Sequence, residues 1–274
     1  MNCKVGFIGC GNMGGALLHC ACETVAGNEI MICDRDENKI KDLCEKYGVL
    51  PGSADEVVSN CKFIFLGVKP QHLQNLLHEI KDSIAARTDE FVLVSMAASV
   101  SIESISNMLS LKKTCPIIRI MPNLPVCVGE GMIIYSLNGH VKKSQSDEFE
   151  EILNKAGTLD RIDEGLIDAA SAITGCGPAF VYMFIQSMAD GGVKCGLSRD
   201  KALLYASKTV LGSAKHVISS KIHPEVLKDA VCSPGGTTID GVCTLEKFSF
   251  RSGVARAVEA SYEKTCKLAG KNKK

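Results

Sequence analysis

The sequence predicts an α/β fold, a doubly wound parallel sheet, followed by an all-helical second part. Up to about residue 160, short apolar runs of β type alternate with amphipathic helical segments, which is typical of a parallel sheet covered on both faces. A glycine-rich turn follows the first apolar run, and from residue 163 long helical segments follow almost without strand patterns. We therefore predict two domains, residues 1–162 and 163–274.

The individual elements are predicted from short segments of β-favouring side chains and from helical spacing of apolar residues. Leu73, Leu76, Leu77 and Ile80, for example, form one stripe on a helix. The predicted strands are 5–8, 29–33, 62–66, 91–95, 116–120, 131–136 and 158–162, and the predicted helices are 37–47, 71–84, 101–109 and 146–155.

The first glycine-rich segment is Gly9-Cys10-Gly11-Asn12-Met13-Gly14, placed as in dinucleotide-binding folds of the Rossmann type. A strand that turns into a helix presents free N–H groups to a pyrophosphate, and glycines allow a close approach. Asp34 follows the second apolar run, where such folds place the residue that contacts the adenosine ribose. The alternative is a structural turn with Asp34 capping the next helix. The candidate cofactor contacts at the turn are Ile8, Gly9, Cys10, Gly11, Asn12 and Met13.

Residues that directly follow the other strands are further candidates, because ligands of doubly wound sheets lie outside the carboxyl ends of the strands. Pro70 can begin a helix and leaves Lys69 at the strand end, although a lysine there is more often simply solvated. Ala97 and Ala98 leave room for a flat group, and Asn123 offers a rigid amide to a nicotinamide or ribose. These candidates are Gly67, Val68, Lys69, Pro70, Met96, Ala97, Ala98 and Asn123.

A second distinctive segment lies between two helical segments of the second domain and runs from Ser233 to Asp240. Its proline, glycines and hydroxyls precede a helix and form a set of N–H donors that suits a small carboxylate. A helix–helix connection with a threonine N-cap is the structural alternative. The candidate substrate contacts are Ser233, Gly235, Gly236, Thr237 and Thr238.

The segment from Pro178 to Lys194 is apolar nearly all round, so another surface must cover it. We expect a second copy of the chain to do so across a two-fold axis, which predicts a homodimer. An ordinary helix in the core of one chain is the alternative.

Composition limits the classes of partner and site. Lys plus Arg equal Asp plus Glu at 31 each, so we expect no nucleic-acid partner. We also expect no membrane span, because no apolar stretch free of charge is long enough. The 14 cysteines lie mostly in apolar runs of a chain without a secretory leader pattern, which predicts a cytoplasmic protein. No Cys-x-x-Cys pair occurs, so no metal site is expected.

Over nearly its full length the chain resembles the pyrroline-5-carboxylate reductase family. The motifs that carry the resemblance are Gly11-Asn12-Met13-Gly14, Val68-Lys69-Pro70, Met121-Pro122-Asn123, Gly175-Cys176-Gly177-Pro178-Ala179, Ala189-Asp190-Gly191-Gly192-Val193 and Ser233-Pro234-Gly235-Gly236-Thr237-Thr238-Ile239.

The resemblance implies NAD(P)H-dependent reduction of 1-pyrroline-5-carboxylate to L-proline. It implies an NAD(P)-binding domain over 1–162, a helical dimerisation and substrate-binding domain over 163–274, and often rings of dimers. It further implies that residues 233–238 form the substrate loop and that Thr238, the catalytic candidate, hydrogen-bonds the pyrroline nitrogen.

The sequence leaves the choice of cofactor open. Asp34 favours NADH, because a carboxylate binds ribose hydroxyls and repels a 2′-phosphate, whereas Arg35 is a good phosphate partner. Asp34 can also face away and cap the next helix through its spacing to Glu37. We place NADPH first and NADH second.

Two other functions compete with this one. A β-hydroxyacid dehydrogenase also joins a Rossmann domain to helices and uses a lysine, here Lys194 or Lys208, but it has no use for the loop 233–238. The second competing function is that of a binding protein that senses NADPH without oxidising it.

Overall fold

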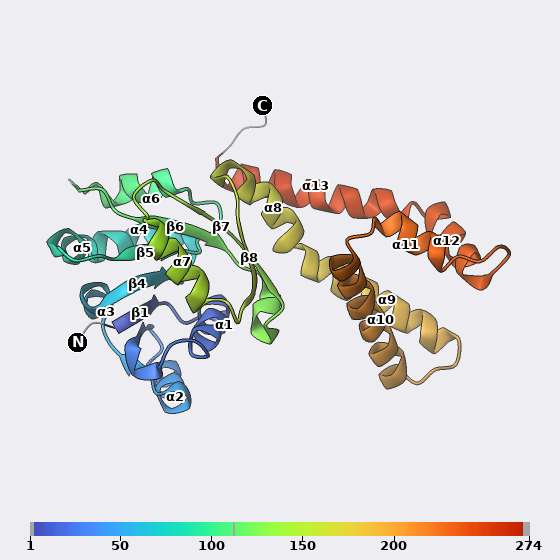
Figure 1. The fold of residues 1–274 in the computed structure, drawn as a ribbon, viewed down its shortest axis with the longest axis horizontal. Helices are drawn as coiled ribbons and strands as arrows, with labels where there is room; N and C mark the ends of the chain where they lie inside the picture. Colours follow the sequence, from blue (N-terminus) through green and yellow to red (C-terminus); the bar gives the residue numbers. More distant parts are fainter. Residues whose placement is uncertain (1–2, 112, 271–274) are drawn as a thin grey trace. The chain divides into compact units, whose positions relative to one another are not determined.

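The computed structural model describes residues 3–111 and 113–270. Contacts between residues divide the chain into two compact units. The first, called the sheet unit, runs up to Gly175 and includes the chain from Tyr262 onward; the second, the helical unit, is Cys176–Ser261 (Figure 1). The predicted boundary at 162/163 coincides with the end of the last strand and stays a prediction for the functional domains.

The sheet unit is built on one sheet with the strand order β3-β2-β1-β4-β5-β6-β7-β8. The first six strands follow the dinucleotide-binding order, so the direction of winding reverses between β1 and β4. The strands are β1 (Cys3–Ile8), β2 (Ile30–Cys33), β3 (Leu50–Pro51), β4 (Cys61–Leu66), β5 (Val92–Ser95), β6 (Ile117–Met121), β7 (Gly131–Leu137) and β8 (Gly157–Arg161).

The last two strands run opposite to the first six: β8 is parallel to β7, and β7 pairs with β6 in the antiparallel direction. Residues 122–130 join β6 to β7, and that connection is shorter than the dozen or so residues that a parallel crossover needs. β8 then pairs with β7 in the parallel direction through the crossover helix α7 (Lys143–Ile152).

Helices cover both faces of the sheet, as the alternating pattern predicts (Figure 1). Phe7 of β1 and Phe65 of β4 face one core with α1 (Asn12–Ala21), α2 (Glu37–Tyr47) and α7. Ile64 and Leu66 face the other core, whose helices are α3 (Ala54–Asn60), α4 (Pro70–Glu79), α5 (Lys81–Ala86) and α6 (Ile102–Leu109). The short 3-10 helices are η1 (Gly27–Glu29), η2 (Leu124–Val128) and η3 (Glu164–Leu166).

The structure differs from the predicted elements in three places. The expected helix 71–84 is two helices, α4 and α5, which meet at Ile80. Strand β3 is missing from the prediction because it is two residues long. Helix α3 is also missing, although Ser53 and Glu56 form a capping box that marks its start in the sequence.

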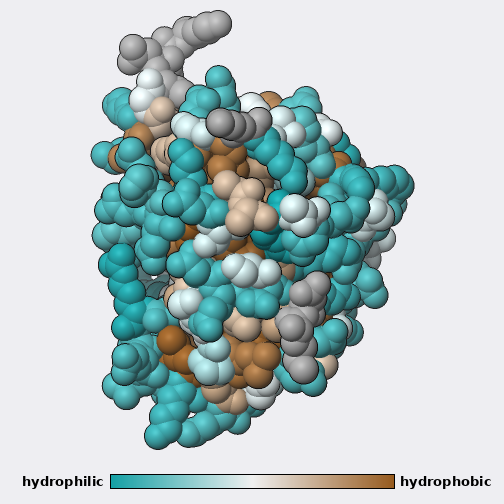
Figure 2. Space-filling view, turned by 90° about the vertical axis from the view of Figure 1, so that its left-hand side faces the viewer, coloured by the Kyte–Doolittle hydropathy of each residue, from teal (hydrophilic) through white to brown (hydrophobic). Residues whose placement is uncertain are grey.

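The helical unit contains little core of its own. Its buried side chains are Ala189, Ala202 and Ala206, where α9 (Gly177–Lys194) packs on α10 (Arg199–Ser220). The remaining helices are α11 (Pro224–Ala230), α12 (Thr237–Lys247) and α13 (Phe250–Leu268), the last of which continues beyond this unit. Figure 2 shows the face of the molecule that lies on the left in Figure 1. This face is mostly hydrophilic and has small separate apolar patches.

Candidate active site

The glycine turn after β1 is packed against the turn after β4 so closely that side chains are excluded. Gly9 has a φ of +97°, and its N–H donates to Cys33 O at 2.7 Å. A Cβ on Gly14 or on Gly67 would lie 2.2 Å from Gly9 O. The predicted glycines therefore bring the carboxyl ends of β1 and β4 together at the point where the winding reverses, which is where such folds bind ligands.

The start of α1 is open for a ligand. Its N-cap is Gly11, which supplies no side chain to cap the first N–H groups, and a Cβ on Gly11 would meet no heavy atom within 4 Å. Asn12 is exposed and Met13 is half-buried, whereas the side chains of Ile8 and Cys10 are buried and leave only their backbone for contacts. Unpaired amides at the positive end of a helix fit a pyrophosphate.

Asp34 turns its carboxylate toward the glycine turn. The Cys10 N–H donates to Asp34 Oδ2 at 2.7 Å, and the Asp36 N–H donates to Asp34 Oδ1 at 3.1 Å. Lys39 Nζ lies 3.7 Å from Oδ1. Partial burial acts to raise the pKa of Asp34, but these N–H groups and the lysine together lower the pKa below its ordinary value.

The alternative in which Asp34 caps the next helix is wrong. The N-cap of α2 is Asp36, whose side chain accepts a hydrogen bond from the Lys39 N–H at 3.2 Å. Asp34 lies two residues before that N-cap, and its carboxylate bridges the loop between β1 and α1 and the start of α2.

The candidates after β4 and β5 surround the same edge of the sheet. Pro70 is the first residue of α4, as predicted, and Lys69 is its exposed N-cap. Met96 and Ala98 are half-buried, but the Ala97 side chain packs into the core, so only its backbone can reach a ligand. Gly67 and Val68 lie directly after β4, where their contacts with a cofactor stay a prediction.

Asn123 has a structural function in addition to the one predicted. Its Nδ2 donates to Thr174 O at 3.0 Å, and its Oδ1 accepts from the Met132 N–H at 2.8 Å. The amide thus joins the end of β6 to the start of β7 and to the end of α8 (Ile167–Thr174). A contact between Asn123 and a cofactor stays a prediction, which would use the second N–H of the amide.

The predicted substrate loop forms a tight turn in the helical unit. The Gly236 N–H donates to Ser233 O at 3.0 Å, and Gly235 has a φ of +68°; with Pro234 before it, these are features of a type II turn. A Cβ on Gly236 would lie 2.3 Å from Ser233 Oγ. Gly235 is therefore required by its backbone conformation, whereas a side chain at position 236 would have to displace the Ser233 hydroxyl.

The loop leads into an uncapped helix. The N-cap of α12 is Gly236 and not a threonine, so the structural alternative of a threonine cap is wrong. Thr237 and Thr238 are exposed in the first turn, and the Thr238 hydroxyl makes no hydrogen bond with any residue in the described part of the chain. Free amides and free hydroxyls of this kind suit a small anion with a polar neighbour.

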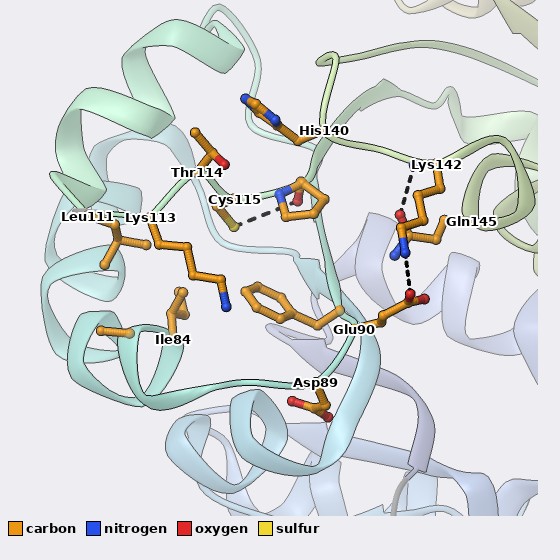
Figure 3. A pocket seen from close by; sticks show the side chains of 13 residues that line it. Ile84, Asp89, Glu90, Leu111, Lys113, Thr114, Cys115, His140, Lys142 and Gln145 are labelled. Atoms are coloured by element: carbon orange, nitrogen blue, oxygen red, sulfur yellow. Dashed lines mark hydrogen bonds and ion pairs between the residues drawn. The ribbon is translucent and has the colours of Figure 1, made fainter.

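A pocket of about 240 Å³ lies away from all of these residues. It is found at the amino ends of β5 and β6, where Phe91 and Pro116 precede the strands (Figure 3). Its charged side chains are already engaged: Lys142 pairs with Glu90, and Lys113 Nζ donates to Arg87 O at 3.2 Å. None of the predicted site residues lines it.

Comparisons with known proteins find a different family model in each half of the chain. The family described as pyrroline-5-carboxylate reductase dimerisation matches residues 164–268, and the family described as NADP oxidoreductase, coenzyme F420-dependent, matches residues 4–99. The pyrroline-5-carboxylate reductase of Aquifex aeolicus is 36% identical over 266 residues, 97% of each chain. That of Escherichia coli is 37% identical over 272 residues, 98% of this chain and 99% of the relative. The chain belongs to the pyrroline-5-carboxylate reductase family.

A solved structure supports the same assignment. Plasmodium falciparum pyrroline carboxylate reductase with NADP bound matches with a TM-score of 0.86 at 34% identity, over 98% of both chains. The Rossmann-type sheet and the helical second part predicted from the sequence are thereby confirmed for this member of the reductase family.

The apolar segment of this reductase corrects one expectation. Within the described residues, Glu164–Lys194 is long and apolar enough to cross a membrane by length and composition alone, so the statement that no such stretch exists is wrong. A single such segment is weak support for a span, and here the helix is interrupted, because α8 ends at Thr174 and α9 begins at Gly177. The family described as dimerisation matches residues 164–268 and so includes this segment. Contact with another protein surface is a different physical reason for an exposed apolar face.

An ion-pair cluster that joins α11, α12 and α13 is missing from the predicted site. Arg251 donates to Glu225 Oε1 at 2.8 Å and to Oε2 at 3.3 Å, and its Nε donates to Glu246. Glu225 lies in α11 and Glu246 in α12, the helices on either side of residues 233–236. Lys228 also donates to Glu225, at 2.9 Å. Arg251 follows Glu225 by 26 positions, so no local sequence pattern reveals this bidentate pair.

Proposed function

We propose that this chain is a pyrroline-5-carboxylate reductase, which transfers a hydride from NAD(P)H to the cyclic imine of 1-pyrroline-5-carboxylate and gives L-proline. The observation that carries the proposal is the similarity, at 36–37% identity over at least 97% of the chain, to reductases of that name. The geometry agrees, because each unit offers one open, amide-rich turn at the start of a helix.

The sheet unit supplies the cofactor side of the proposal. When bound, the reduced nicotinamide cofactor supplies the hydride. The N–H groups at the start of α1 hold the pyrophosphate, since Gly11 leaves the space above them empty. The Asp34 carboxylate, fixed beside the turn, accepts hydrogen bonds from the ribose hydroxyls.

The helical unit supplies the substrate side. The amides at the start of α12 bind the substrate carboxylate, and the free Thr238 hydroxyl accepts a hydrogen bond from the protonated ring nitrogen. The hydride forms the new C–H bond at the imine carbon while the C=N π electrons move to nitrogen, so the proton already on nitrogen completes the secondary amine. Residues 233–238 contain no histidine or carboxylate, and the imine is protonated by solvent before it binds.

The proposed dimer is argued from the exposed side chains of α9. Apolar residues on α9 are open to solvent in the single chain, and a homodimer covers them. We extend the proposal to rings of dimers and to a cytoplasmic protein that binds neither nucleic acid nor membrane. The exposed apolar side chains of α9 are Val181, Tyr182, Met183, Phe184 and Met188.

Loss of nicotinamide absorbance tests the proposal directly. The purified chain is mixed with NADH or NADPH and with 1-pyrroline-5-carboxylate, and proline is quantified as the product. Equal amounts of oxidised cofactor and proline are expected. A sensor would bind cofactor without oxidising it, and a β-hydroxyacid dehydrogenase would instead reduce its cofactor when given 3-hydroxy acids; either result would overturn the proposal.

A further inference from the structure

Several hydrogen-bond donors and a cation that would suit an anion lie beside the proposed ribose position. The Asp34 carboxylate already binds them. Its two oxygens accept the N–H groups of Cys10 and Asp36, and the Lys39 ammonium lies 3.7 Å from Oδ1. Two backbone amides and one cation thus already have an anionic partner supplied by the chain. The same donors would suit a phosphate if the carboxylate were absent.

The carboxylate is also prevented from moving aside. Hydrogen bonds at 2.7 Å and 3.1 Å hold both oxygens, one toward the turn after β1 and the other toward the start of α2. An ionised carboxylate only accepts hydrogen bonds, and its two oxygens offer about four lone-pair sites, more than these two bonds use. Asp34 can therefore accept from ribose hydroxyls, whereas a 2′-phosphate would bring a second anion against it.

We propose that Asp34 makes this reductase select NADH over NADPH, because its carboxylate holds the position and the donors that a 2′-phosphate would need. This inference rests on the proposed use of a nicotinamide cofactor and reverses the order in which the sequence alone placed the two cofactors.

Arg35 is the residue that favours the opposite choice. It is exposed and follows Asp34 directly, so its guanidinium is free to reach a phosphate at the surface. Any phosphate that it bound would still lie beside the fixed carboxylate of its neighbour. Arg35 therefore becomes a useful phosphate partner only when the charge of Asp34 is removed.

Direct binding measurements on the full chain test the inference without turnover. Kd values for NADH and NADPH are measured by calorimetry at one ionic strength for the wild type, for Asp34→Asn, and for Asp36→Asn as the matched control. Asn keeps an acceptor for the Cys10 N–H and removes the charge, while Asp36→Asn removes a charge two residues away and keeps the helix cap.

The wild type is expected to bind NADH at least about tenfold more tightly than NADPH, since like charges placed together cost several kcal/mol. Asp34→Asn should reduce that ratio by about tenfold or more, chiefly through tighter NADPH, and Asp36→Asn should change it by less than about threefold. Adding Arg35→Ala to Asp34→Asn should weaken NADPH again and leave NADH nearly unchanged. Thermal unfolding of each variant verifies that it is folded.

Two results separate the inference from the proposed function. If the wild type binds NADPH as tightly as NADH, or if Asp34→Asn leaves the ratio unaltered, the role of Asp34 is wrong while the reductase assignment stands. If the folded wild type binds neither cofactor, both fail.

Discussion

The guanidinium of Arg119 on β6 donates a hydrogen bond of 2.9 Å to Asp168 Oδ1 on α8, and both side chains are almost completely buried. The same guanidinium contacts Glu164 Oε1 at 3.2 Å, and that oxygen accepts the Ile102 N–H at 2.7 Å. The buried pair therefore fastens α8 to the sheet and to the start of α6. This is the part of the sheet unit from which the chain continues into the helical unit.

Asp168→Ala should be among the most destabilising changes in the sheet unit. It leaves the buried Arg119 guanidinium with only its contact to Glu164, so the expected cost is about 3 kcal/mol of unfolding free energy, at the lower end for breaking a buried pair. Asp147→Ala is the control, because Asp147 pairs with Lys143 where both side chains are more than half exposed, and such pairs contribute about 0–1 kcal/mol. Urea unfolding of both variants measures the difference. Equal losses would show that the buried pair does not hold α8.

Alanine substitutions at Gly14 and Gly11 should distinguish an effect on stability from an effect on cofactor binding. A Cβ on Gly14 would lie 2.2 Å from Gly9 O, so Gly14→Ala should cost about 1–3 kcal/mol of stability through forced backbone shifts. A Cβ on Gly11 meets no atom within 4 Å, and Gly11→Ala should cost about 1 kcal/mol or less. Its methyl group instead fills the space proposed for the pyrophosphate.

Gly11→Ala should therefore raise the Kd for NADH by at least about tenfold while the chain stays folded. Calorimetric titration gives the Kd, and urea unfolding gives the stability of both variants. A Gly11→Ala protein that binds NADH as tightly as the wild type would move the pyrophosphate away from the start of α1.

The features predicted well from sequence depend on local rules. The glycine turn, the helix start at Pro70 and strands such as β4 follow from backbone geometry and from apolar runs that neighbouring residues supply. The alternative in which Asp34 caps the helix fails for a local reason as well, because Asp36 also precedes the helix and its own side chain reaches the Lys39 N–H.

The features that sequence could not give depend on contacts between distant residues. Nothing near Arg251 identifies Glu225 as its partner, and nothing near Asn123 shows that its amide binds the end of α8. The direction in which the Asp34 carboxylate turns is decided by the Cys10 N–H, 24 residues earlier. Such pairings depend on how elements pack, which local pattern does not encode.

The ion-pair cluster around Glu225 predicts a dependence of stability on pH. The Arg251 guanidinium, and then Lys228, lower the pKa of Glu225 from 4.5 to about 2. A carboxyl whose pKa is lower in the folded state adds stability above its unfolded pKa, and that contribution is lost as the pH falls from 4.5 toward 2. Glu225→Gln should therefore lose less stability than the wild type over this range.

Urea midpoints at about pH 5 and about pH 3, at low and high salt, measure this effect. Because Glu225 lies at the surface, the difference between wild type and Glu225→Gln should shrink at high salt. Glu37→Gln, at an exposed position of α2, is the control. If Glu225→Gln and the wild type lose stability in parallel at low salt, the cluster contributes nothing to the fold.

Thr238 provides the sharpest test of the substrate loop. Its hydroxyl is free in the first turn of α12, whereas the Thr244 hydroxyl on the same helix donates to Asp240 O at 2.9 Å. A hydrogen bond to a charged group contributes about 1.5–3 kcal/mol, so Thr238→Ala should lower turnover by about tenfold to a hundredfold. Thr238→Ser keeps the hydroxyl and should retain most of the activity.

The cofactor Kd should be unchanged in Thr238→Ala, because the proposed cofactor contacts belong to the sheet unit. Thr244→Ala removes a hydroxyl of the same kind from the same helix and should leave turnover nearly normal. Steady-state assays with 1-pyrroline-5-carboxylate, together with cofactor titrations, distinguish these cases. Full turnover in Thr238→Ala would remove the hydroxyl from the reaction, and a loss in Thr244→Ala of similar size would mean that both variants act through the stability of α12 and not through the ring nitrogen.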